Sequence, residues 1–514
     1  MPERVQHRGE WIAGAAMTVS AVAALGLFPL MTDFSYSTMT HAKWLGLQGL
    51  WALALVCAVT AVLALWTARQ GRQIRWHPVS LLALGYLAWV GVSAWLGPLG
   101  HQLNERGEWV WWMGAVRYEG MAAKLCYVLL MFCLSLYPQR WRATLGAAAL
   151  TLGIFCGVVA LQYLGRNPLG LFPVGRSIYT NYEFQGTIGN IDMVSGYVSL
   201  VMPMLLAGYV LLPGRGWHLL AGAGLGMLLT LCMEVQSGLI VMGFALLWTV
   251  GYALCHGEKW RRCLLVLAVG VCCLGLRMLL RLPWLDGGSI AGLRWSSAGA
   301  VLLLAGVLLA LAAWRMGRPT AKAPRSLRPR TVVLLAVLLV LAMLLALRVA
   351  ELPESMGGLY ELSEILHGRV QDSFGSYRLG VWRNTLLMAR EHLWTGTGPN
   401  TFVYAMYQQL QQEGLSYPET FDSAHNQYLT ILAENGLPGL MFYVAFLVGA
   451  LWLGVRRARQ TPLLWLTTLP LACYALQDVF SFSICLVAPM FWAVAGMHLA
   501  ALGKNEQGNR GELS

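Results

Sequence analysis

The chain has 514 residues, of which 57% are hydrophobic and only 12% charged, with a mean hydropathy of +0.57. A soluble chain is normally about a quarter charged, so this composition excludes an ordinary soluble globular protein. The formal net charge of +12 does not indicate a nucleic-acid partner, because the basic residues are not interleaved with aromatic residues on one soluble face.

Most of the apolar residues lie in long runs. A run of about 20 apolar residues can cross a bilayer, because a helix satisfies every backbone N–H and C=O group internally. Fourteen candidate runs occur, at 11–32, 44–67, 78–97, 118–137, 143–164, 191–212, 218–234, 238–255, 263–280, 296–314, 331–350, 437–455, 463–478 and 480–502. Some of these runs are short, and the last two are separated only at Asp478. We therefore expect an all-α polytopic membrane protein with roughly 12–14 transmembrane helices.

The distribution of lysine and arginine predicts the orientation, because cytoplasmic loops carry an excess of these residues. If the N-terminus is inside, the alternate loops hold 22 of the 36 basic residues but only 5 of the 24 acidic ones. These loops are 1–10, 68–77, 137–142, 213–218, 256–262, 314–330, 456–462 and 503–514. We therefore expect both termini in the cytoplasm.

The spans and loops divide the chain into four parts. Residues 1–350 form a transmembrane bundle of about 11 spans, and 351–436 form a large extracytoplasmic loop with amphipathic helices. Residues 437–502 form the C-terminal transmembrane helices, and 503–514 form a cytoplasmic tail. The eleven cysteines all fall within spans or at their edges, which indicates neither a disulfide framework nor a zinc site. We see no acidic pair in an outer loop suited to a divalent ion, and we expect no metal and no cofactor.

The large loop is expected to contain two helices. Residues 376–393 place apolar side chains at helical spacing and end at a glycine-rich turn. A second helix is expected to begin at Asp422 or Ser423, with His425 in its first turn, and to end at Gly436 before the next span. Both helices could equally lie along the bilayer surface.

Four outer arginines, Arg117, Arg176, Arg378 and Arg383, indicate an anionic ligand near the level of the lipid headgroups, although Arg117 could instead pair with the nearby Glu119. Arginine suits a diphosphate because its planar fork binds two oxygens at once and remains charged.

His425 is the candidate general base. Near a helix N-terminus the helix dipole disfavours the imidazolium form, and a neutral imidazole can take a proton from an attacking sugar hydroxyl. A histidine next to an asparagine is, however, more often structural.

The string SAHNQYLTILAENGLPG, which contains His425, resembles the H-N-x-x-L-x-x-x-x-E-x-G region of the O-antigen ligase and polymerase superfamily of membrane glycosyltransferases. Three further segments are similar to the same family: RYEG at 117–120, GTIGNIDMVSGY at 186–197, and YRLGVW from Tyr377 with the GTGPNTF turn that follows. Together they cover about residues 110–445.

The resemblance implies a bacterial cell-membrane enzyme that acts on the extracytoplasmic face. Such an enzyme moves a glycan from a polyprenyl diphosphate carrier to a hydroxyl on a glycan, lipid or protein acceptor. His425 matches the proposed base of the family and Arg378 an arginine that stabilises diphosphate, while Asn426 and Asn190 match positions near the site.

The chain departs from the family pattern at one turn. Members often carry Ser-Arg-Gly in a short outer turn between two middle spans, where this chain has VQSG at 235–238. Arg117 or Arg176 could replace the missing arginine, or the donor could be bound differently.

Two other functional classes are compatible with the composition. A transporter or flippase for a lipid-linked glycan is the main alternative, and a sensor or scaffold without catalysis is a third. The sequence does not choose between ligase and polymerase.

Overall fold

The computed structural model describes residues 2–71, 74, 76–172, 184–214, 216–281, 292–316, 326–415 and 421–503. Each of the fourteen predicted runs overlaps a helix. Helices of the first part are α1 (Pro2–Val22), with the π and 3-10 turns η1 (Ala23–Leu27) and η2 (Phe28–Leu30), α2 (Met39–Thr67), α3 (Ser80–Leu96), α4 (Val110–Met113), α5 (Met121–Ser135), α6 (Trp141–Tyr163), α7 (Ile191–Leu211), α8 (Trp217–Met233), α9 (Gln236–Cys255), α10 (Trp260–Leu279), α11 (Ser297–Met316) and α12 (Pro329–Val349). The later helices are α13 (Gly358–Leu366), α14 (Arg378–Glu391), α15 (Phe402–Glu413), α16 (Gln427–Arg457), α17 (Trp465–Gln477) and α18 (Ala488–Gly503).

The prediction of an all-α polytopic membrane protein is confirmed. In the described part of the chain, nine helical segments are long and apolar enough to cross a membrane, and α3, α5, α8 and α18 are shorter apolar helices. The strands in the described ranges are very short, with β1 (Leu280–Arg281) pairing antiparallel with β2 (Gly292–Leu293).

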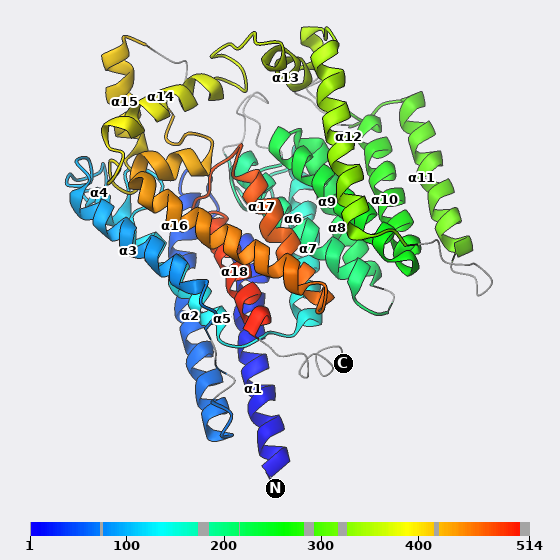
Figure 1. Ribbon diagram of the computed structural model, residues 1–514, viewed down its shortest axis with the longest axis horizontal. Helices are drawn as coiled ribbons and strands as arrows, with labels where there is room; N and C mark the ends of the chain where they lie inside the picture. Colours follow the sequence, from blue (N-terminus) through cyan, green and yellow to red (C-terminus); the bar gives the residue numbers. More distant parts are fainter. Residues whose placement is uncertain are drawn as a thin grey trace.

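Helix burial separates the centre of the bundle from its edge. In the most apolar 18-residue stretch of α7, 94% of the residues are buried. In the corresponding stretch of α12, none of the residues is buried. Figure 1 shows α10, α11 and α12 standing together on one side of the molecule, while α13, α14 and α15 lie across the end of the bundle opposite the N-terminus. The side chain of Ser363 ties α13 to the end of α12 by donating to the carbonyls of Leu347 (2.9 Å) and Ala350 (3.0 Å).

Helix α16 is bent at Gly436, which has φ +67° and ψ −179°. The prediction that the loop helix ends at Gly436 before a separate span is confirmed, because the non-helical Gly436 separates a first helix from the apolar helix that follows it. Glycine is required there because a Cβ atom would lie 2.2 Å from the carbonyl oxygen of Trp394. The break and Pro438 free carbonyls of the first half of α16. The turn after α14 occupies them, since Thr397 N donates to Ala433 O and Gly398 N to Glu434 O, each at 2.9 Å.

A non-helical segment, 478–487, joins α17 to α18 and returns to the beginning of α16. Gln427 N donates to Asp478 O at 2.8 Å, and Ser483 N donates to the side-chain oxygen of Gln427 at 2.9 Å. The predicted span 480–502 is consequently helical only from Ala488. This segment brings C-terminal residues next to His425.

Candidate functional site

His425 lies two residues before α16 and adopts a left-handed backbone conformation with φ +47°. The expectation that it occupies the first turn of the helix is wrong. Asn426 is the N-cap instead of Asp422 or Ser423, and its side-chain oxygen accepts from Leu429 N at 3.0 Å. A non-glycine residue with positive φ costs of order 1–3 kcal/mol and is typical of functional sites.

The imidazole of His425 is held between two aromatic rings. Phe421 and Phe482 meet it edge-on, with centroid distances of 6.0 and 5.0 Å. The Nδ1 atom is buried and has no hydrogen-bond partner among the described residues, although the side chain as a whole remains 23% exposed. Because Nδ1 is sealed off, a substrate hydroxyl can reach the ring only at Nε2.

Burial lowers the pKa of His425 below its ordinary value of 6.5, and four charges modify this effect. The Asp192 carboxylate opposes it most strongly, Arg378 reinforces it, Asp422 opposes it and Arg117 reinforces it. The imidazole is therefore neutral at pH 7. Burial, which the sequence did not reveal, is the largest cause of this shift.

Asn190 and Asp192 form the beginning of α7. The Asn190 side-chain oxygen accepts from the backbone N–H groups of Asp192 (3.0 Å) and Met193 (3.1 Å), so Asn190 caps the helix. The Asp192 carboxylate lies 3.9 Å from Nδ1 of His425. The structure thus brings the GTIGNIDMVSGY segment next to the histidine.

Arg117 lies close to His425 but is engaged by a carboxylate. Its Nε donates to Asp422 at 2.5 Å, and its guanidinium lies over the Phe482 ring, 4.7 Å from the centroid. Glu119 does not pair with Arg117. Its carboxylate bonds to Lys124 and to the Tyr127 hydroxyl.

Arg378 and Arg383 both belong to α14 but differ in their surroundings. The guanidinium of Arg378 has no ion-pair or hydrogen-bond partner among the described residues, and it lies close enough to His425 to lower the pKa of that imidazole. Arg383 pairs with Asp372 at 3.0 Å, and both side chains are about half exposed. Arg176 falls outside the described residues.

The turn at 235–238 lacks the arginine that the family pattern predicts. An arginine from another helix, however, lies beside this turn. Arg277, in the last turn of α10, forms an ion pair with Glu234, directly before the turn. Only 12% of the Arg277 side chain is exposed. Sequence spacing could not reveal this neighbour, because 43 residues separate the two partners.

Three parts of the site escaped prediction from sequence: the approach of Asp192 to His425, the pairing of Asp422 with Arg117, and the contribution of Phe482. Each depends on contacts between distant segments. The signal that could have pointed to Asp192 is its place two residues after Asn190 in a motif already singled out.

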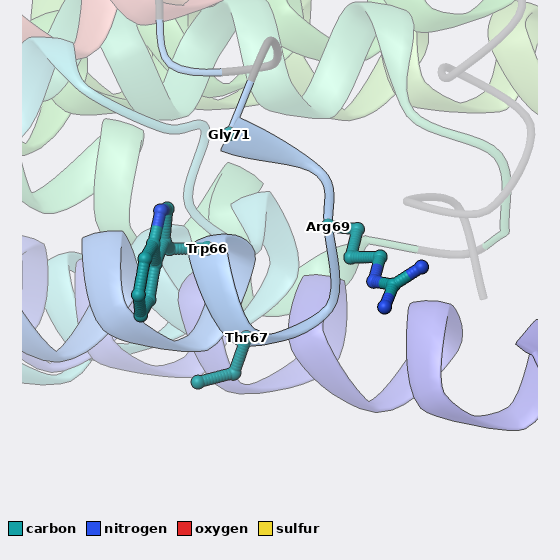
Figure 2. A pocket seen from close by; sticks show the side chains of 4 residues that line it. All are labelled: Trp66, Thr67, Arg69 and Gly71. Carbon is teal, nitrogen blue, oxygen red and sulfur yellow. The ribbon is translucent and has the colours of Figure 1, made fainter.

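A pocket on the surface lies elsewhere. It is lined by Trp66, Thr67, Arg69 and Gly71 at the end of α2, as Figure 2 shows. This end of α2 is opposite to α13, α14 and α15 (Figure 1), and the pocket shares no residue with the surroundings of His425. No group of three or more His, Cys, Asp or Glu side chains within the described ranges is placed to hold a metal ion.

Comparison with known proteins identifies one family. Residues 288–444 match the model of the O-antigen ligase family. This segment includes Arg378, Asp422 and His425 but not Arg117 or Asp192, so the site combines the matched domain with helices that precede it. No curated protein matches the chain. The chain is thus a multi-pass membrane protein whose residues 288–444 match the O-antigen ligase family, a family of glycosyltransferase-like enzymes.

Proposed function

We propose that the protein transfers a glycan from a polyprenyl diphosphate carrier to an acceptor hydroxyl, on the extracytoplasmic face of a bacterial cell membrane. The observation that carries the proposal is an imidazole packed between Phe421 and Phe482, with its Nδ1 buried and unpaired, near an arginine without a partner among the described residues. The family match to residues 288–444 supports glycosyl transfer as the reaction class.

In the proposed reaction, Nε2 of His425 accepts the proton of the acceptor hydroxyl as its oxygen attacks the anomeric carbon. The bond from that carbon to the diphosphate breaks on the opposite face, with inversion. The lipid diphosphate leaves with its electron pair, and the guanidinium of Arg378 neutralises the growing charge. These steps require no divalent metal.

Of the described arginines near His425, Arg378 is the one available for a diphosphate. Arg117 is engaged by Asp422 and Arg383 by Asp372, so either would first have to exchange its partner. We assign donor binding to Arg378 and an auxiliary role to Arg117, Arg176 and Arg383. Asn190 caps the first turn of α7, which carries Asp192. Asn426 caps α16, which begins directly after His425 and Asn426. Both asparagines therefore shape the site.

The placement of the site outside the cell rests on the loop charges. An excess of basic residues on alternate loops places both termini in the cytoplasm and α13, α14 and α15 outside. In this arrangement 1–350 and 437–502 are the membrane parts, 351–436 is the outer loop and 503–514 is a cytoplasmic tail.

The test is a transfer assay with purified protein in detergent, without any ion gradient. A glycan on undecaprenyl diphosphate is supplied alone or with a lipid acceptor. We expect transfer by the wild type and by His392→Asn, a histidine substitution in the same loop, and none by His425→Asn. Chain extension with donor alone indicates a polymerase, and a product on the added acceptor indicates a ligase. A wild-type protein that moves the lipid-linked glycan across vesicles but makes no glycosidic product would instead be a transporter or flippase.

A further inference from the structure

We propose that Asp192 is a positioning residue for His425: it holds the imidazole in the tautomer with its proton on Nδ1, and it stabilises the imidazolium that forms during transfer. The proposal rests on the proposed role of His425 as the base. Asp192 lies outside the segment that matches the O-antigen ligase family.

The first argument is geometric. The Asp192 Oδ2 atom is 3.9 Å from Nδ1, the ring nitrogen that is buried without a partner among the described residues. This distance exceeds that of a hydrogen bond, but catalytic hydrogen bonds are often long in the absence of substrate and shorten when it binds. The backbone of Asp192 is fixed by the Asn190 cap and by the buried helix α7. The Asp192 carboxylate is therefore held beside Nδ1 of the imidazole.

The second argument concerns charge. Four charged groups influence His425, namely Asp192, Arg378, Asp422 and Arg117. The Asp422 carboxylate is neutralised by its 2.5 Å contact with Arg117. The Asp192 carboxylate has no hydrogen-bond or ion-pair partner other than His425 among the described residues. Asp192 is thus the carboxylate available to balance a positive imidazolium.

The third argument concerns the tautomer. A neutral imidazole carries its proton on one nitrogen and accepts at the other. For Nε2 to accept the substrate proton, Nδ1 must carry the ring proton, and a buried N–H group without an acceptor is costly. Asp192 supplies that acceptor. When Nε2 takes up the second proton, the Nδ1–H group faces a carboxylate, and the cation is stabilised.

The decisive experiment compares Asp192→Asn with the wild type, using Asp33→Asn, an exposed aspartate near the beginning of α2, as the matched control. We expect kcat to fall at least about tenfold, which is part of the 10²–10⁴ that a general base contributes, with an unchanged KM for the donor. The acid limb of the pH profile should move to lower pH, because Asp192 raises the pKa of His425. Asp192→Glu should restore part of the rate and return the limb towards that of the wild type.

The outcomes separate this inference from the proposed function. If His425→Asn is inactive but Asp192→Asn keeps the kcat and the pH profile of the wild type, the positioning role is wrong and the base remains. If His425→Asn is active, both are wrong. Should Asp192→Asn fail to fold, Asp192→Ser, which leaves the Asn190 cap of α7 in place, is measured under the same criteria.

Discussion

Two groups of ionisable side chains lie where the bundle meets the outer loop, and they differ in how completely they are partnered. In the first, the Glu119 carboxylate bonds to both Lys124 and Tyr127, and Glu434 accepts from Phe402 N at 3.3 Å. We call the side chains of Glu119, Lys124, Tyr127 and Glu434 the paired cluster. In the second, Nδ1 of His425 has no partner in the described part of the chain.

Arg378 and Asp192 complete this second group, which we call the open cluster. Buried polar groups in proteins are nearly always hydrogen-bonded, and an exception calls for an explanation. We infer that the paired cluster holds the fold together, whereas the open cluster keeps its groups ready for a substrate. Substitutions should therefore reduce stability in the first group and activity in the second.

The largest expected effect is on activity, in His425→Asn. A positioned base contributes about 10²–10⁴-fold, so the transfer rate should fall by at least about a hundredfold. Asparagine tolerates positive φ better than most residues, so the melting temperature should remain that of the wild type. Initial rates and thermal melting on one preparation check both points. A variant that retains more than about a tenth of the rate would remove His425 from the mechanism.

Lys124→Met tests the paired cluster. Removing one partner of a buried ion pair costs about 3–5 kcal/mol, because it leaves the Glu119 carboxylate buried without its counter-ion. We expect a large fall in the melting temperature in detergent, whereas Lys259→Met, in the 3-10 helix between α9 and α10 (Gly257–Lys259), should change it little. Equal stability of the two variants would contradict a structural role for the cluster.

Arg378→Lys tests the arginine of the open cluster. Lysine keeps the charge but cannot form two parallel hydrogen bonds to a diphosphate. Because charge-assisted hydrogen bonds contribute about 1.5–3 kcal/mol, we expect the donor KM to rise about tenfold or more. Arg390→Lys, in the last turn of the same helix and exposed, is the control and should leave the KM unchanged. An unaltered donor KM in Arg378→Lys would exclude a bidentate contact.

The smallest expected effect is a shift in pH dependence. Burial lowers the pKa of His425, so the acid limb of kcat/KM should lie below the 6.5 of an ordinary histidine. The positive charge of Arg378 lowers this pKa further, so Arg378→Gln should move the limb to higher pH. The profile is measured at saturating acceptor. A shift to lower pH in this variant would show that the two side chains do not interact as described.

The sequence predicted the membrane helices well because a run of apolar residues is a local signal. The break in α16 was predicted by a local signal too, since Gly436 and Pro438 are typical of the end of a helix. The sequence did not reveal that the N–H groups of Thr397 and Gly398 bond to the carbonyls freed at this break. That contact is not visible in local sequence.

Prediction of the site was less complete for the same reason. His425, Arg378 and Arg117 were singled out by residue type and motif, and the structure places them close together. The motif did not reveal that Asp422 engages Arg117 or that the segment 478–487 brings Phe482 against the imidazole. Pairing between segments hundreds of residues apart follows from tertiary packing, which a single sequence does not display.

The account depends above all on the face of the membrane to which His425 belongs, because a lipid-linked glycan can be transferred outside the cell only by a site exposed there. Labelling of spheroplasts with a membrane-impermeant maleimide tests this directly, using Glu413→Cys at the end of α15 and Glu258→Cys between α9 and α10, both exposed positions. The account predicts labelling of Glu413→Cys in intact spheroplasts and of Glu258→Cys only after permeabilisation, relative to the unlabelled wild type. Labelling in the reverse pattern would place the open cluster in the cytosol and contradict the proposed reaction.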